Sequence, residues 1–155
     1  MSPSSSGRNT ATRAVDAWES LFRAQVSLMR RFTADDIWGS ISLREYDVLF
    51  TLSKCNGRKL RLHDLNDEIL LSQPSLSRLC ERLEKLGYVA REPDPGDKRG
   101  TVVLLTDDGL AIQREIGRRH AARIRRYVGD ALSDEELVTL TALCTKLRLA
   151  QPDIL

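Results

Sequence analysis

The sequence predicts a mainly α-helical chain with one small β-hairpin, an α+β class of fold. Apolar residues recur every three or four positions over several long stretches, which is the periodicity of amphipathic α-helices. Residues 88–105 instead hold two β-prone runs around a segment rich in Pro, Gly and Asp, a pattern typical of a hairpin. With 155 residues, 41% of them apolar, the chain is long enough for one domain with a core of its own.

The N-terminal region predicts a tail followed by a long helix. Residues 1–10, MSPSSSGRNT, are rich in Ser and nearly free of apolar side chains, so we expect them to be disordered. A single domain then occupies residues 11–155. Its first helix covers about residues 11–32, and its apolar stripe comprises Val15, Trp18, Phe22, Val26 and Met29.

The next segment predicts two further helices and a short strand. Ser42 and Glu45 have the spacing of a capping box, so a second helix begins there, with a core face made of Tyr46, Leu49 and Phe50. The Asn-Gly pair at 56–57 ends it. Residues 59–62 are expected to form a strand against the hairpin, and residues 63–70 a short helix.

The residues after position 71 predict a helix with one apolar side. Ser72 can cap the first turn, Pro74 is tolerated there, and Gly87 suits a left-handed helix end. The spacing predicts a buried stripe of Leu76, Leu79, Leu83 and Leu86. The exposed N-terminal half, Ser-Gln-Pro-Ser-Leu-Ser-Arg, therefore carries polar side chains on the opposite face and flank.

The hairpin follows this helix directly. Runs 88–92 and 101–105 are β-prone, and a turn-rich loop over residues 93–100 joins them, with Lys98 and Arg99 at its tip. A short helix, a second helix with an exposed polar end and a basic hairpin have the layout of a winged helix-turn-helix. Such a helix fits the major groove of DNA, and an Arg on a hairpin can reach the adjacent minor groove.

Two more helices are expected after the hairpin. Thr106 caps a long helix whose first turn contains Asp107 and Asp108, and Ser133 with Glu136 forms a second capping box. The small lobe alone could not cover the apolar stripes of these helices and of the first one. We expect two chains to pack these stripes together as a homodimer, and the alternative is a monomeric bundle.

The run 65–109 resembles the DNA-binding lobe of the multiple-antibiotic-resistance regulator (MarR) family. The matching residues include Leu71-Ser72, Pro74-Ser75, Ser77-Arg78-Leu79, Arg82-Leu83-Glu84, Gly87, Asp94, Asp97, Arg99 and Leu105-Thr106. This resemblance implies a winged helix-turn-helix lobe over about residues 43–106, with dimerisation helices over about 11–32 and 107–150. It also implies that residues 72–78 contact the major groove and that Arg99, oriented by Asp97, enters the minor groove.

The expected function is therefore sequence-specific transcriptional regulation, as a ligand-responsive repressor on a pseudo-palindromic operator in double-stranded DNA. The alternative is a winged-helix protein-interaction module that does not read DNA. The expected DNA-binding residues are Ser72, Gln73, Pro74, Ser75, Ser77, Arg78, Arg82, Asp97, Lys98 and Arg99. A small aromatic or anionic effector is expected where the first two helices meet the lobe, near Trp18, Phe22 and Trp38.

Other functions find no support in the sequence. Cys55, Cys80 and Cys144 lie far apart and only two His residues are present, so neither a metal site nor a disulfide framework is expected. No catalytic triad spacing or phosphate-binding glycine loop is present, so we expect neither an enzyme nor a cofactor. No run is long enough to span a membrane and no signal segment opens the chain, which favours the cytoplasm.

Overall fold

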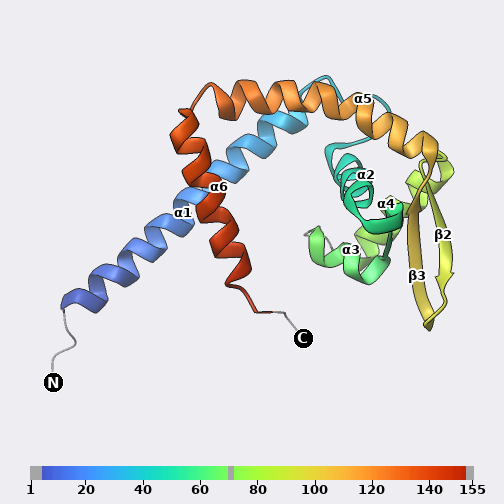
Figure 1. The fold of residues 1–155 in the computed structure, drawn as a ribbon, viewed down its shortest axis with the longest axis horizontal. Helices are drawn as coiled ribbons and strands as arrows, with labels where there is room; N and C mark the ends of the chain where they lie inside the picture. Colours follow the sequence, from blue (N-terminus) through green and yellow to red (C-terminus); the bar gives the residue numbers. More distant parts are fainter. Residues whose placement is uncertain (1–4, 70–71, 153–155) are drawn as a thin grey trace.

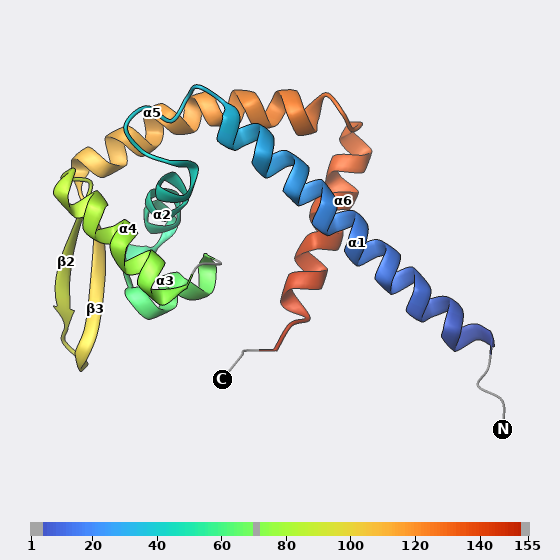
Figure 2. The same ribbon diagram turned by 180° about the vertical axis from the view of Figure 1, so that it is seen from behind.

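The computed structural model describes residues 5–69 and 72–152 and divides them into a lobe and a set of long helices (Figures 1 and 2). The lobe contains α2 (Leu43–Lys54), α3 (Leu62–Glu68), α4 (Gln73–Lys85) and the three strands. The long helices are α1 (Ser5–Ala34), α5 (Asp107–Ile124) and α6 (Asp134–Leu149). Helix α5 runs from the hairpin to α6 and connects the two parts, which confirms the predicted fold class.

Helix α1 is longer than predicted. It spans 30 residues from Ser5, so residues 5–10 are helical and the prediction of a disordered tail is wrong for them; residues 1–4 lie outside the described part. Extending an existing helix costs far less free energy than starting one. The helix formed by the amphipathic segment can therefore extend backward into the polar residues that precede it. Composition alone does not reveal this effect.

The core of the lobe is formed where α2, α3, α4 and the sheet meet. Helix α2 starts at the predicted capping box, in which Glu45 N–H donates to Ser42 Oγ at 3.2 Å and Ser42 N–H donates to Glu45 Oε2 at 2.8 Å. Side chains with no exposed surface come from all these elements: Val48, Leu49, Leu52, Leu65, Leu76, Cys80, Leu83 and Val103. Phe50, predicted to be in the core, is 42% exposed.

The strands form an antiparallel sheet in the order β1-β3-β2, with β1 at Lys59–Arg61, β2 at Val89–Asp94 and β3 at Asp97–Leu105. The predicted eight-residue loop is wrong, because pairing continues through Pro93 opposite Thr101 and, after an irregularity, to Asp94 opposite Asp97. Pro93 is tolerated because β2 is an edge strand. Lys98 and Arg99 therefore lie on β3, close to a two-residue turn.

An aromatic cluster joins α5 to the lobe. The His120 ring lies with its centroid 4.9 Å from Phe32, 5.0 Å from Trp38 and 5.5 Å from Tyr46. Burial lowers the pKa of His120, so the neutral imidazole is favoured there. His120, which interrupts the apolar stripe of α5, thus packs where the long helices meet the lobe.

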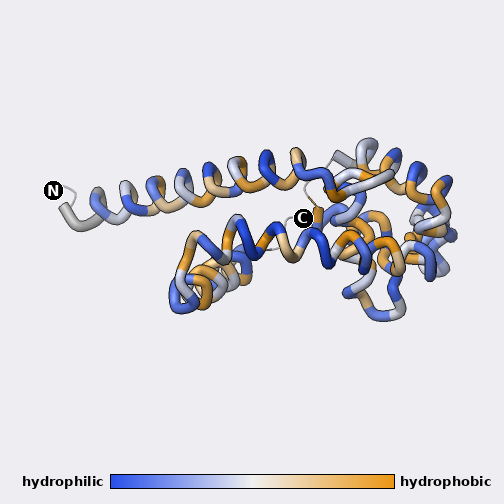
Figure 3. The backbone as a smooth tube through the Cα atoms, turned by 90° about the horizontal axis from the view of Figure 1, so that it is seen from above, coloured by the Kyte–Doolittle hydropathy of each residue, from blue (hydrophilic) through white to orange (hydrophobic). Residues whose placement is uncertain are grey.

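The long helices leave apolar side chains uncovered in the single chain. Val15, Trp18, Leu143 and Leu147 are each at least half exposed, and Figure 3 shows apolar and polar positions alternating along α1. A five-residue π-helical segment, Arg125–Gly129, ends the α5 helix before the chain turns into α6. Among the described residues no helix is both long and apolar enough to cross a membrane.

Candidate nucleic-acid interface

The first two turns of α4 present the polar face that the sequence predicts. Ser72 caps the helix by accepting a hydrogen bond from Ser75 N–H at 3.4 Å, and its hydroxyl donates to Ser75 Oγ at 2.8 Å. Pro74 and Arg78 are exposed, and Ser77 is half-buried. Within the described residues, no hydrogen bond or ion pair holds the Arg78 side chain, so its guanidinium is available to a ligand.

Helix α4 buries a slightly different stripe from the predicted one. Leu76, Cys80 and Leu83 are fully buried, whereas Leu86 is 38% exposed. Burial raises the pKa of Cys80 to about 11, so this thiol stays protonated and unreactive at neutral pH. The stripe fixes the rotation of α4 and directs Arg78 away from the core.

Arg82, predicted as a DNA contact, is half exposed, but its guanidinium is engaged by other groups of the protein. Its guanidinium pairs with the buried Glu45 carboxylate and donates to the Ser40 carbonyl at 2.8 Å. No local sequence pattern predicts this contact, because the partners are 37 positions apart along the chain. Arg82 therefore connects α4 to the start of α2.

The wing is built around Asp94. This carboxylate, 5% exposed, pairs with Arg61 Nε of β1 at 2.7 Å and accepts a hydrogen bond from Gly96 N–H at 2.9 Å. A Cβ at Gly100 would lie 3.0 Å from the Cβ of Asp94, so the turn fits closely around it. Sequence reasoning missed the structural role of Asp94, although an Asp two positions before a Gly is a known turn signal.

The basic side chains of the wing are solvent-facing. Asp97, Lys98 and Arg99 are all exposed. Asp97 accepts a hydrogen bond from the Arg99 backbone N–H at 3.0 Å, so it shapes the backbone next to the turn rather than pairing with the guanidinium. The contact by which Asp97 orients Arg99 is therefore made through the main chain.

A second ion pair fixes the wing to α4. Arg91 on β2 donates to Glu84 at 3.0 Å through Nη2, and Arg91 N–H donates to the same carboxylate at 3.1 Å. These hydrogen bonds lower the pKa of Glu84. This ion pair therefore joins the wing to α4, the expected recognition helix, which carries Arg78, while the wing carries Arg99.

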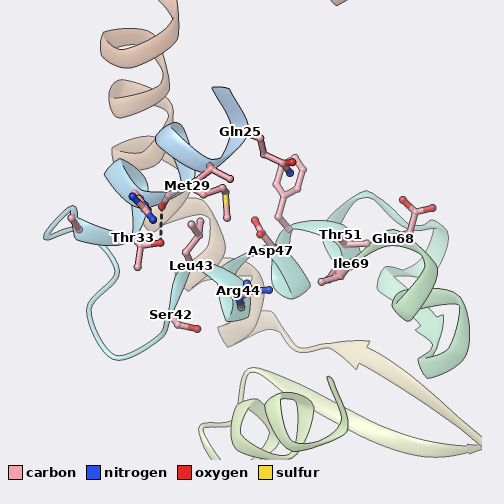
Figure 4. Close-up of a pocket in the computed structure, with 14 residues that line it drawn as sticks. Gln25, Met29, Thr33, Ser42, Leu43, Arg44, Asp47, Thr51, Glu68 and Ile69 are labelled. Atoms are coloured by element: carbon pink, nitrogen blue, oxygen red, sulfur yellow. Dashed lines mark hydrogen bonds between the residues drawn. The ribbon is translucent and has the colours of Figure 1, made fainter. Parts of the chain in front are cut away.

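A cavity of about 980 Å³ lies where α1 and α2 meet the end of α3, the place predicted for an effector. Figure 4 shows side chains from α1, α2 and the end of α3 around it. Its polar wall includes Arg30, Arg44, Asp47 and Glu68. Burial raises the pKa of Asp47 to about 6, although Arg44 opposes the shift.

The three aromatic residues predicted for this pocket lie elsewhere in the described structure. Trp18 and Phe22 stack on α1 with ring centroids 5.9 Å apart, and Trp18 lines a separate hollow beside α6. Trp38 is buried and donates from Nε1 to the Phe32 carbonyl at 2.7 Å. Trp38 thus lies apart from the stacked pair, and among the described residues the aromatic side chain that lines the cavity is that of Phe50.

Replacing Asp47 by asparagine is expected to stabilise the protein at neutral pH. The folded state raises the pKa of Asp47 from 3.8 to about 6, so it favours the protonated carboxyl. The contribution of this group to stability is complete below pH 3.8 and is lost as the pH rises through 6, because the charged carboxylate is disfavoured in the folded state. Asparagine stays neutral at every pH and avoids this loss. Denaturant titrations of Asp47→Asn and the parent should therefore agree near pH 4 and diverge by pH 7.5. A constant difference across this range would contradict the shift.

Comparison with known proteins gives a consistent picture. The model of the MarR family matches residues 40–100, the segment that runs from α2 to the wing. The transcriptional regulator PecS of Dickeya dadantii is 28% identical over 123 residues, which is 77% of this chain and 74% of PecS. The Streptomyces coelicolor MarR family regulator Sco3205, solved in complex with DNA, superimposes with a TM-score of 0.76 at 29% identity, over 88% of this chain and 87% of Sco3205.

A third similar protein, NadR, was solved in complex with 4-hydroxyphenylacetate. It shares 26% identity with this chain and superimposes with a TM-score of 0.70, over 85% of this chain and 92% of NadR. The superpositions on Sco3205 and NadR cover 88% and 85% of this chain, so they include the long helices as well as the lobe. Together with the family model that matches residues 40–100, they show that this chain is similar to the winged helix-turn-helix regulators of the MarR family.

Proposed function

We propose that this protein is a DNA-binding transcriptional regulator that acts as a ligand-responsive repressor. A homodimer would place two copies of α4 in successive major grooves of a pseudo-palindromic operator. The observation that carries this proposal is the exposed end of α4, where Arg78 lacks a partner within the described residues while Glu84 and Arg91 fix the helix to the wing. A DNA partner implies a cytoplasmic location.

The proposed contacts follow from these positions. Major-groove contacts are assigned to Ser72, Pro74, Ser75, Ser77 and Arg78, and minor-groove contacts to Lys98 and Arg99, with Asp97 shaping the backbone beside the turn. The side chain of Gln73, for which a DNA contact is also expected, lies outside the described part of the structure. For Arg82 we propose a structural role instead, because its guanidinium donates to Glu45 and to the Ser40 carbonyl, and its predicted DNA contact stays a prediction. The uncovered apolar side chains of α1 and α6 supply the surface for the second copy.

Selection of bound sites from random DNA tests the proposal directly. The expected result is enrichment of one two-fold symmetric sequence whose half-sites lie about one helical turn apart. Sedimentation of the protein with and without this DNA should give the mass of a dimer. Failure to enrich any sequence would instead favour an interaction module that has kept the fold without reading DNA.

Replacing Arg99 by alanine should weaken operator binding and lower its dependence on salt. An Arg in a narrow minor groove gains from the enhanced negative potential there, and each phosphate-neutralising cation lost lowers the slope of log K against log salt by about 1. Binding titrations at several salt concentrations would measure both quantities. Equal salt slopes for Arg99→Ala and the parent would show that the wing stays away from DNA.

The cavity beside α2 is proposed as the effector site. Arg30 and Arg44 offer cations to a carboxylate, Asp47 can accept a hydrogen bond from a hydroxyl group, and Met29 and Phe50 provide apolar surface. This chemistry suits a phenolic acid, the class of ligand present in the NadR structure. Calorimetry with 4-hydroxyphenylacetate should show binding that Arg44→Met weakens, and a variant that binds as well as the parent would exclude this site.

A further inference from the structure

Arg82 and Glu45 connect the recognition helix to the wall of the cavity. Glu45 uses both carboxylate oxygens: Oε2 accepts from Ser42 N–H at the start of α2, and Oε1 accepts from Arg82 Nη1 on α4. The second nitrogen of Arg82, Nη2, donates to the Ser40 carbonyl just before α2. One guanidinium thus binds both the helix cap and the chain leading into it.

The same turn of α2 forms part of the cavity. Ser42, Leu43 and Arg44 line it, and Figure 4 shows them at the start of α2, with Leu43 next to the α1 residues Met29 and Thr33. The first turn of α2 therefore has the cavity on one side and α4 on the other. Any group that enters the cavity and displaces this turn also displaces Glu45.

Burial of Glu45 and the geometry of the contact allow it to transmit such a displacement. The Glu45 side chain is only 7% exposed, and a buried carboxylate that loses its cation is strongly disfavoured. Charge-assisted hydrogen bonds from a guanidinium also have a demanding geometry. Movement of α2 with Glu45 still paired requires α4 to follow, and with α4 the Arg78 side chain.

We propose that Glu45 and Arg82 are positioning residues that couple occupancy of the cavity to the placement of the recognition helix. They touch neither the DNA nor the ligand, and they make the position of α4 depend on the first turn of α2. This inference rests on the proposed function and adds to it the route by which the effector site reaches the DNA-binding surface.

The test fills the cavity without requiring the natural ligand. Thr33, on the α1 side of the cavity, is replaced in a background in which the accessible thiols are removed (Thr33→Cys with Cys55→Ser and Cys144→Ser), while Cys80 stays buried. Reaction with benzyl methanethiosulfonate then places an aromatic ring in the cavity. Operator affinity is measured with and without the label. The coupling ratio is the affinity of the unlabelled protein divided by that of the labelled protein.

We expect labelling to lower operator affinity by about 5-fold to 150-fold, the usual range for coupled sites. Arg82→Gln should bring the ratio close to 1, and Arg82→Lys should restore part of it. The matched control is Arg91→Gln, which removes the contact of α4 with the wing instead. It should weaken operator binding yet keep the parent's ratio.

Each outcome decides a different question. A parent that selects no operator overturns the proposed function, whereas a parent that binds its operator with a ratio of 1 overturns only the coupling. A full ratio in Arg82→Gln assigns the coupling to other residues and also overturns the inference. If Arg82→Gln does not fold, amide exchange of the parent decides: labelling should alter exchange in α4 as well as in α2, and a change confined to α1 and α2 contradicts the proposal.

Discussion

Replacing Arg78 by alanine is expected to abolish specific operator binding while leaving the fold intact. Arg78 is exposed on α4, opposite the buried stripe that contains Leu76, Cys80 and Leu83. A bidentate contact between Arg and a base contributes about 1–3 kcal/mol per half-site. In a homodimer two such contacts are lost, about 2–6 kcal/mol, which corresponds to a loss of affinity of about 30-fold to more than 10⁴-fold.

Binding titrations against the selected operator and an unrelated duplex would measure this loss. The affinity of Arg78→Ala for the unrelated duplex should fall much less, because phosphate contacts dominate non-specific binding. A matched control is Arg114→Ala, since Arg114 is also exposed on a helix but belongs to α5. Parent-like operator affinity in Arg78→Ala, or an equal loss in Arg114→Ala, would show that α4 does not read the bases.

Local sequence signals predicted the helices and their starts well. The capping boxes at Ser42 and Ser133 and the Thr106 cap all appear in the structure as predicted. Gly87 adopts the expected left-handed conformation, with φ of 80°. Each of these features is determined by residues within one helical turn of each other, so a short stretch of sequence is enough to predict it.

Features that depend on distant residues were not predictable in the same way. The sequence predicts DNA contacts for both Arg78 and Arg82, yet in the structure Glu45 pairs with Arg82. The sequence assigns Glu45 only to a capping box, which it also forms. Trp18 and Trp38 look equally available to a ligand, but Trp38 is buried by packing against α2 and α5. Burial and pairing of this kind are decided by tertiary structure.

Of the substitutions proposed for this protein, Gly109→Ala is expected to lower the free energy of unfolding the most. Gly109 lies in the first turn of α5, and a Cβ there would stand 2.0 Å from the Tyr88 carbonyl oxygen and 2.8 Å from Leu105 Cδ1. The Tyr88 carbonyl cannot move freely, because it accepts a hydrogen bond from Thr106 N–H at 3.1 Å. Relief of the clash must therefore separate α5 from the hairpin, at a cost of about 3 kcal/mol or more.

Gly117→Ala provides the control in the same helix. Its Cβ would meet no backbone atom among its nearest neighbours, which are Tyr46 Oη at 3.0 Å and Gln113 Nε2 at 3.2 Å, so a shift of a few tenths of an ångström in these side-chain ends relieves the contact. Alanine has a higher helix propensity than glycine, by about 1 kcal/mol, and this gain applies to both variants. It cancels when their free energies of unfolding are compared, so the remaining difference measures the backbone clash at position 109. Urea titrations at one protein concentration should place Gly117→Ala within about 1 kcal/mol of the parent and Gly109→Ala far below it. Equal stability of the two variants would mean that α5 and the hairpin are not joined as closely as Gly109 requires, and the wing would then lack the fixed position that DNA contact by Arg99 demands.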